Sequence, residues 1–442
     1  MRAIKKHFFL KITSLVIGLL ISFSACHNKQ TPLETKHPII TIDIENNLLN
    51  FKILKLSTLN ASVRYIPLQT NDETTLQSIL NLDLNDSLLI VNDFYKLLLF
   101  NLNGVFISEI AKKGRGPHEH LSIASPRLNN REIYVPDYIR NRMKIYNTYG
   151  EELYQVNFPE RSLYNMARLK NWIQFTDTSY LVSKININGQ EKYRVMEVGI
   201  NGKLLRGFEN TTFFKLYKNN ANDHYAYGSV NMTYHMYKFQ ENYRLFHKLS
   251  DTVWQIDNSR IYPAYILNRG KHGLNHQLFG IQRTSKEFRD AFNRSVEVET
   301  FLETNSLIFF QVQYRKQYPF DFIREVQTPF GPTKVKYDIL GVYNKTTKEF
   351  FFVAPSGVDH QLEPLGIEND IDGGINFTPM YSPNERTLVS WFNAYDLKAH
   401  VASEEFRGST PKYPERKREL EALANRLKID DNPVLMVVTF KE

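Results

Sequence analysis

The stretch from Gly114 to His120 gathers basic, imidazole and carboxylate side chains in a glycine-rich setting. Arg115, with Lys112 and Lys113 before it, could receive an anionic ligand, because guanidinium groups bind carboxylates and phosphates and loop amides add donors. In the alternative interpretation, glycine and proline set the path of a connecting loop and the charges are solvated. Arg115 is therefore a candidate ligand-binding residue.

Two histidines of this stretch, His118 and His120, would face one side of an extended strand, since alternate residues share a face. Two imidazoles could ligate a metal, but zinc takes three or four ligands, and no further ligands stand out at a suitable spacing. We therefore predict no metal and no other cofactor, and we keep His118 as a candidate ligand-binding residue.

A second polar group follows the apolar run at residues 133–136. Asp137 and Arg142 could line a ligand site there, although such side chains more often bind turn amides or pack between sheets. The acidic pair Asp370 and Asp372 lacks the spacing and the glutamate of a calcium loop. The sequence signatures of a nucleophile elbow, a phosphate loop and a zinc protease are absent, so no catalytic residue is assigned.

The N-terminus has the pattern of an export signal. Four positive charges fall within residues 1–11, a mostly apolar stretch covers residues 12–23, and small residues precede Cys26. An apolar stretch of this length is short for a bilayer, which needs roughly 20 residues. Cys26 is the only cysteine in the chain, and acylation would remove the redox liability of an unpaired exported thiol.

The residues Phe23-Ser24-Ala25-Cys26 resemble the lipobox of bacterial lipoproteins, although a leucine usually stands where this chain has Phe23. The resemblance implies a signal peptide at residues 1–25 and a lipid on Cys26; a secretory signal with an incidental cysteine is the alternative. No acidic run, which in related lipoproteins accompanies surface display, follows the cysteine. We therefore expect an outer-membrane lipoprotein of the cell envelope that faces the periplasm.

Charge limits the classes of partner. Four of the 55 basic residues precede Cys26 and no acidic residue does, so 51 basic residues face 47 acidic ones in the remainder. A net charge of +4 over such a length gives no support for nucleic-acid binding. Aromatic residues make up 13% of the chain, and this content favours β-strands.

Residues 88–106 and 133–154 share one order of predicted elements: strand, polar loop, strand, tight turn, strand. Asn101 and Asn147 are 46 residues apart, as are Gly104 and Gly150, and glycine allows the positive φ that such a turn requires. Looser copies cover residues 193–208, 252–262 and 341–353. A period near 45 residues is typical of propeller blades, whereas a β-sandwich needs similar strands without this recurrence.

These patterns predict an all-β fold: a six-bladed β-propeller over residues 61–442, preceded at residues 26–60 by a tether and a leading strand. Strands at residues 63–68 and 433–440 should complete one blade together, because an open ring would leave sheet edges unpaired. One or two short helices are expected, at residues 414–427 and 285–294.

The link from Gly114 to Glu119 and the loop from Asp137 to Arg142 resemble motifs of six-bladed NHL/TolB-like propellers. Residues 250–256 and 430–435 resemble the corresponding stretches of Bacteroides six-bladed propeller lipoproteins of unknown function, of the DUF4221-like kind. The resemblance implies a fold and a place in the cell envelope, and it implies no reaction.

The predicted function is that of a binding or scaffold module, held at the membrane by its lipid, for a glycan, a peptide or an envelope partner protein. Aromatic side chains could stack on sugar faces; the candidates are Tyr138, Trp172, Tyr225, Tyr227 and Trp391. One alternative is a channel-centred enzyme of lyase, hydrolase or lactonase type that acts on a glycan or small molecule. Another is a structural subunit of an envelope complex.

Overall fold

A computed structural model describes residues 38–441 of the chain with internal gaps. Within these described residues, no helix combines the length and the apolar character needed to cross a membrane. The gaps are residues 124, 138, 141, 158–171, 184–185, 187–188, 217–233, 249, 316–322, 329–330, 337–338 and 355–365.

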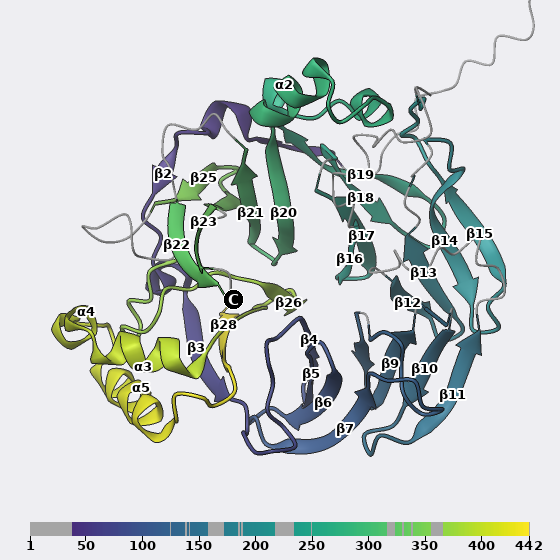
Figure 1. Ribbon diagram of the computed structural model, residues 1–442. Helices are drawn as coiled ribbons and strands as arrows, with labels where there is room; N and C mark the ends of the chain where they lie inside the picture. The colour runs from purple at the N-terminus through teal and green to yellow at the C-terminus, as the bar shows by residue number, and fades with distance from the viewer. Residues whose placement is uncertain are drawn as a thin grey trace, which may run out of the picture. The chain divides into compact units, whose positions relative to one another are not determined.

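Six β-sheets stand around a central axis as the blades of a propeller (Figure 1), which confirms the predicted fold class. Blade 1 contains β4 (Asn81–Leu84), β5 (Leu88–Asn92), β6 (Lys96–Asn101) and β7 (Phe106–Lys112). Blade 2 contains β8 (Arg127–Asn129), β9 (Glu132–Asp137), β10 (Arg142–Tyr146) and β11 (Glu152–Asn157). Blade 3 contains β12 (Trp172–Thr176), β13 (Ser179–Ser183), β14 (Tyr193–Gly199) and β15 (Leu204–Glu209).

The second half of the ring repeats this plan with additions. Blade 4 contains β16 (Tyr234–Phe239), β17 (Asn242–His247), β18 (Thr252–Ile256) and β19 (Ile261–Asn268). Blade 5 contains β20 (Val296–Glu303), β21 (Leu307–Tyr314), β24 (Ile339–Asn344) and β25 (Phe350–Val353). Blade 6 contains β26 (Tyr381–Asn384), β27 (Thr387–Phe392), β28 (Val434–Phe440) and β3 (Ala61–Pro67). In every blade the strand named first lies innermost. In blade 6 the outermost strand, β3, comes from the N-terminal side of the propeller.

Apolar side chains on both faces of β6 explain why the blades stack. Leu98 and Phe100 pack with residues of blade 6, whereas Leu97 and Leu99, on the opposite face, pack with residues of blade 2. All four side chains are fully buried. A strand that is covered on both faces has a continuous apolar run instead of alternation, and the core of the molecule therefore lies between the blades.

The repeated Asn and Gly residues form equivalent turns in blades 1 and 2. The Asn101 side chain accepts a hydrogen bond from the amide of Val105 at 3.1 Å, and Asn147 accepts one from Glu151 at 3.0 Å. Gly104 and Gly150 have φ values of +79° and +82°. A Cβ on Gly104 would lie 2.0 Å from the carbonyl oxygen of Pro67 in blade 6, so glycine is needed where the turn meets the neighbouring blade.

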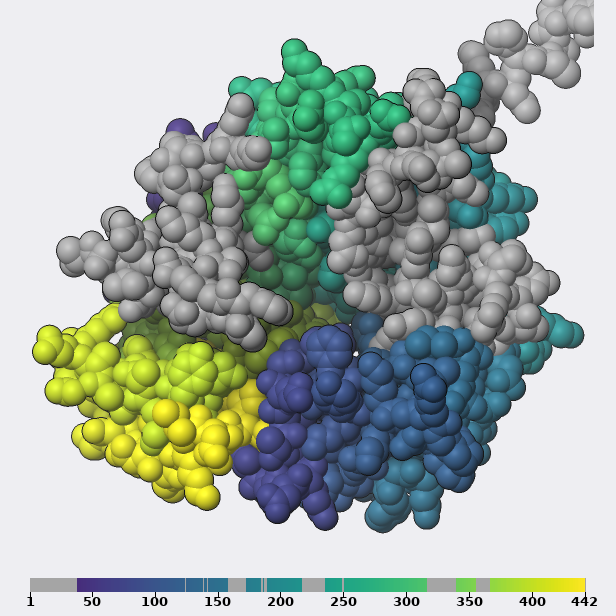
Figure 2. Space-filling view, in the orientation of Figure 1, coloured from purple at the N-terminus to yellow at the C-terminus, as the bar shows by residue number. Residues whose placement is uncertain are grey.

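The ring closes where the two ends of the propeller pair. Strand β3 runs antiparallel to β28, with Tyr65 opposite Met436 and Arg64 opposite Val437. In Figure 2 the purple N-terminal blade and the yellow C-terminal elements lie side by side at this closure. The predicted pairing of the early and late strands is confirmed.

The residues before β3 extend the pairing to two more blades. Strand β1 (Ile40–Asp43) adds a parallel strand to the outer edge of β19, and β2 (Phe51–Lys52) does the same at β25. The 3₁₀ helices η1 (Glu45–Asn47) and η2 (Leu56–Leu59) connect these strands to β3. The first described residues therefore contact three consecutive blades.

Helices lie outside the ring. The predicted helix near residue 285 is confirmed as α2 (Lys286–Arg294), whose cap Ser285 accepts from the Phe288 amide at 3.2 Å, and the later one as α5 (Pro414–Arg426). Two helices that we did not predict, α3 (Ala394–Ala402) and α4 (Glu404–Gly408), pack with α5 beside β28. The remaining described elements are η5 (Gly270–His272), η6 (His276–Gly280) and a hairpin of β22 (Ile323–Thr328) with β23 (Gly331–Lys336).

Candidate functional site

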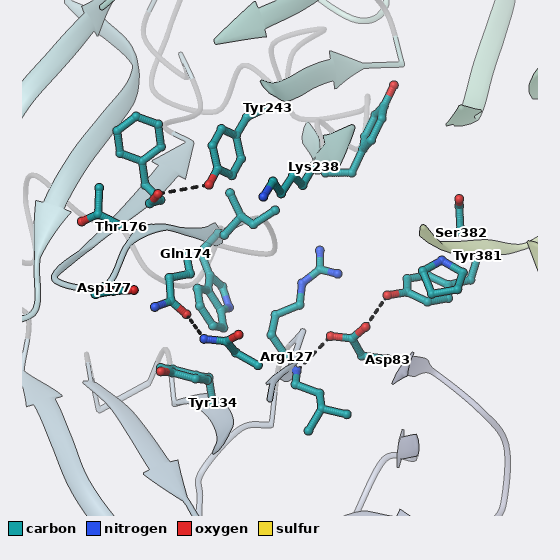
Figure 3. Close-up of a pocket in the computed structure, with 17 residues that line it drawn as sticks. Asp83, Arg127, Tyr134, Gln174, Thr176, Asp177, Lys238, Tyr243, Tyr381 and Ser382 are labelled. Carbon is teal, nitrogen blue, oxygen red and sulfur yellow. Dashed lines mark hydrogen bonds between the residues drawn. The ribbon is translucent and has the colours of Figure 1, made fainter. Parts of the chain in front are cut away.

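The central channel contains a cavity of about 370 Å³. Its walls come mainly from the innermost strands of five blades, β4, β8, β12, β16 and β26 (Figure 3). The cavity lies toward the face of the propeller at which the first strand of each blade turns into the second. Adjacent innermost strands contact one another around the axis. The cavity is therefore built from sheet backbone, which positions side chains more rigidly than loops do.

Asp83, near the end of β4, joins three blades at the cavity wall. Its carboxylate accepts a hydrogen bond from the backbone amide of Leu128 at 2.9 Å and another from the hydroxyl of Tyr381. Burial, followed by the charge of Asp83, raises the pKa of Tyr381 well above its usual value. The phenol therefore stays protonated and donates to a carboxylate that is itself 8% exposed.

Two cations extend into the same cavity, Arg127 from β8 and Lys238 from β16 (Figure 3). The Arg127 Nη2 donates a long hydrogen bond of 3.5 Å to the Met236 carbonyl, and its Nε has no hydrogen-bond partner among the described residues. Lys238 makes a long ion pair of 3.9 Å with Glu241, whose side chain is almost fully exposed. Both cations therefore keep donors that a ligand could use.

Neutral polar and aromatic groups complete the wall. The amide of Asn129 donates to the side-chain oxygen of Gln174 at 2.6 Å, and the Trp172 indole donates to the Ser125 carbonyl at 3.2 Å. Burial raises the pKa of Tyr243, whose hydroxyl donates to the Phe175 carbonyl at 3.1 Å. These bonds fix the rings in place between blades 2, 3 and 4.

The candidate residues Arg115 and His118 lie elsewhere, on the link between β7 and β8. Both side chains are exposed. The Gly116 amide of this link donates to the carboxylate of Glu119 at 2.8 Å. That loop amide is therefore already occupied by a residue of the chain.

Asp137 and Arg142 come together at the β9–β10 turn. Asp137 is fully buried and accepts hydrogen bonds from the amide of Leu121 at 3.2 Å and the hydroxyl of Ser122 at 3.4 Å. The Arg142 Nε lies 3.9 Å from its carboxylate. This turn is at the end of β9 opposite to the β8–β9 turn, so the structure does not bring these residues into the channel cavity.

Other residues singled out from the sequence have separate places. His120 is buried and its Nε2 lies 2.7 Å from the Tyr146 hydroxyl. Asp370 accepts from the Ser57 amide at 2.9 Å, whereas Asp372 accepts from the Tyr65 hydroxyl at 3.0 Å. Among the described residues no cluster of three or more potential metal ligands is found.

Of the five candidate stacking residues, Trp172 lines the cavity. Trp391 lies in β27 and packs partly buried against the core between blades 6 and 1. Cys26 and the other aromatic candidates, Tyr138, Tyr225 and Tyr227, lie outside the described residues.

The sequence patterns did not single out Arg127, Lys238, Asp83 or Tyr381. Each stands in a short strand, and the partners that give it a role come from other blades. One available signal was the position of each residue within the first strand of a blade, just before a turn. That signal requires the blade boundaries to be known first.

A comparison with a solved structure agrees with the fold. A protein from Bacteroides fragilis that is inferred to be exported superposes with a TM-score of 0.60 at 17% identity, over 92% of this chain and 100% of that one. A member of the DUF4221 family from Bacteroides vulgatus gives a TM-score of 0.42 at 12% identity, over 66% of this chain and 86% of that one. No curated protein matches the sequence.

The predicted resemblance to six-bladed propellers of Bacteroides is confirmed, with a different family as the direct match. The family described as domain of unknown function DUF4934 matches residues 39–439, from the residue before β1 to the penultimate residue of β28. This span includes all six blades and the residues that close the ring. The chain, a six-bladed β-propeller, therefore belongs to the DUF4934 family.

Proposed function

We propose that the protein is a ligand-binding module of the bacterial cell envelope that holds a small polar ligand in its channel cavity. The cavity itself carries the proposal, because five blades converge on it and the Arg127 Nε in its wall has no hydrogen-bond partner among the described residues. Its volume of about 370 Å³ falls in the range of small-molecule sites, roughly 300–1,000 Å³. A site fixed by sheets also avoids much of the entropy cost of ordering loops on binding.

We propose further that the module is an outer-membrane lipoprotein on the periplasmic side, with the lipid on Cys26. The charged start, the apolar stretch and the small residues before this cysteine support the anchor. Several acyl chains on one cysteine give stable membrane attachment, which a single chain does not. The structural relative from Bacteroides fragilis, inferred to be exported, agrees with this location.

Metabolic labelling with radioactive palmitate tests the anchor. The full chain should incorporate label and fractionate with membranes, whereas the Cys26→Ser variant should remain unlabelled. Equal labelling of the two proteins would contradict lipidation at Cys26.

Tryptophan fluorescence tests the binding site. The chain contains three tryptophans, at positions 172, 254 and 391, and Trp172 is the one in the cavity wall. We expect a ligand found by a thermal-shift screen of sugars, amino acids and nucleotides to change the emission, and Trp172→Phe to remove that change. Trp391→Phe is the matched control. A response that survives Trp172→Phe and disappears with Trp391→Phe would place the ligand outside the cavity.

A further inference from the structure

The charge of the channel cavity indicates what kind of ligand it binds. Four arginines elsewhere in the propeller each pair with a carboxylate at 2.6–3.1 Å: Arg206 with Glu197, Arg244 with Glu303, Arg269 with Asp251 and Arg315 with Glu297. Arg127 has no such ion pair among the described residues, although its Nε is buried. The Arg127 side chain is half-buried, and a partly buried guanidinium without a counter-ion is less stable than a paired one. An anionic group from a ligand would therefore stabilise it.

One carboxylate of the cavity wall that could pair with Arg127 is that of Asp83, but it accepts hydrogen bonds from neutral donors. Its Oδ2 accepts from the Leu128 amide, and its Oδ1 accepts from the Leu84 amide at 2.9 Å and from the Tyr381 hydroxyl. The other carboxylate of the cavity, that of Asp177, is exposed at the β12–β13 turn and hence screened by water. Neither carboxylate forms an ion pair with Arg127 in the part of the chain that the structure describes.

Lys238 adds a second positive charge from blade 4. Its ammonium group extends into the cavity from β16, while Arg127 enters from β8 (Figure 3). The partner Glu241 is 3.9 Å away and 95% exposed, and such surface pairs contribute little free energy. The two cations therefore favour a ligand with a carboxylate or a similar anion.

The rest of the wall suits a sugar ring. Trp172 and Tyr134 border the cavity but are almost fully buried, whereas Phe175 and Tyr237 are half-buried rings of the same wall. Aromatic rings of this kind pack against the apolar faces of ring-shaped ligands. The side-chain oxygen of Gln174 is used by Asn129 at 2.6 Å, so its amide hydrogens can donate to a hydroxyl. Ser382, on the opposite wall, adds a further hydroxyl (Figure 3).

We infer that the channel cavity binds an acidic saccharide, with the carboxylate of a uronic acid residue held by Arg127 and Lys238. This inference rests on the proposed function, because it specifies the ligand of the same site. The guanidinium fork fits a carboxylate in a bidentate manner, whereas the ammonium acts as a point charge. Arg127 is therefore expected to matter more than Lys238.

Titration calorimetry on the purified full chain tests the inference. The probes are digalacturonate and an unsulfated chondroitin disaccharide as acidic sugars, galactobiose as the neutral counterpart, and inorganic phosphate as an anion without a ring. We expect one of the acidic disaccharides to bind at least about tenfold more tightly than galactobiose and phosphate, the effect of one charge-assisted hydrogen bond. Arg127→Gln should weaken that binding at least about tenfold, and Arg127→Lys should have an intermediate effect.

Lys203→Gln is the matched control, because it removes the same charge from an exposed position at the β14–β15 turn. It should leave the affinity unchanged, and unaltered melting temperatures will show that each variant folds. Equal binding of acidic and neutral sugars, with no effect of Arg127→Gln, would overturn the inference and leave the proposed function standing. If phosphate bound as tightly as the acidic sugars, the site would require only an anion, and the inference of a saccharide ligand would be refuted. Failure of every sugar to bind, while the Trp172 screen finds an uncharged ligand of another class, would also refute it.

Discussion

Glu303 shows how a single buried charge holds two blades together. Its carboxylate, which lies at the end of β20, accepts from the Tyr237 hydroxyl at 3.0 Å, the Arg244 Nε at 3.1 Å and the Lys345 ammonium at 2.8 Å. Burial opposes the charge, but Arg244 and Lys345 outweigh it and lower the pKa of Glu303. The ion pairs therefore link blade 4 to blade 5 close to the axis.

Replacing Glu303 by Gln should destabilise the propeller by about 3 kcal/mol, because Arg244 would be left buried without its counter-ion. Urea unfolding at neutral pH measures the change. The control is Glu349→Gln, which removes a carboxylate that pairs with Lys52 on the surface and should cost below about 1 kcal/mol. Equal effects of the two substitutions would show that the buried pair has no special weight.

His120 predicts a pH dependence of stability. Burial is the main cause that lowers its pKa to about 4, from 6.5, so the folded state holds this histidine neutral. Between pH 6.5 and 4 only the unfolded chain binds the proton. The free energy of unfolding should therefore decrease by about 1.4 kcal/mol for each unit by which the pH is lowered. His247, whose pKa burial lowers to about 3, contributes over the same range. His120→Gln should therefore reduce the slope by about 1.4 kcal/mol per pH unit in urea titrations from pH 7.5 to 4.5, and His118→Gln, at an exposed position, should not.

Among the secondary-structure elements, the strands and turns of blades 1 and 2 could be predicted from the sequence. The hairpin turns at Asn101–Gly104 and Asn147–Gly150 are marked by residues whose backbone and side-chain preferences determine the turn. The outer strands β1 and β2 carry no such signal. Ile40 pairs with Tyr265 in parallel, and short strands whose partners lie so far along the chain leave no pattern in the local sequence.

The strand β1 should nevertheless contribute to stability. Ile42 is fully buried against blades 4 and 5, whereas its neighbour Thr41 is exposed. We expect Ile42→Ala to cost about 2–4 kcal/mol in thermal or urea unfolding, and Thr41→Ala to cost below about 0.5 kcal/mol. If Ile42→Ala reduced the free energy of unfolding by less than about 1 kcal/mol, β1 would not be docked on β19.

At the scale of the whole molecule, the ring could be predicted and the site within it could not. Closure follows from a general rule, since an unpaired edge strand is a liability, and the early and late apolar strands are visible in the sequence. The cavity depends on Asp83, Arg127 and Tyr381, which come from three blades and meet only after all six sheets are in place. Trp172 was predicted as a stacking residue because it is aromatic. Nothing in the sequence favoured it over the other four aromatic candidates.

The closed ring predicts that its two ends can be cross-linked. Ser62 and Thr439 are opposite each other on β3 and β28, and with Cys26→Ser the chain has no other cysteine. The double variant Ser62→Cys, Thr439→Cys should form a disulfide that raises the melting temperature, and reduction should reverse the gain. The single variant Ser62→Cys, as the control, should not respond to reductant. Failure of the pair to oxidise in the folded protein would contradict the register of the closure.

The proposed function requires that the channel cavity is the ligand site. A crystal structure of the protein with a bound uronate disaccharide tests this most directly. We predict density for the sugar between β8, β12 and β16, with its carboxylate within hydrogen-bond distance of Arg127. Density for the sugar on the β7–β8 link near Arg115 and His118, or on the outer edge of a blade, with an unchanged cavity, would show that the ligand site lies elsewhere.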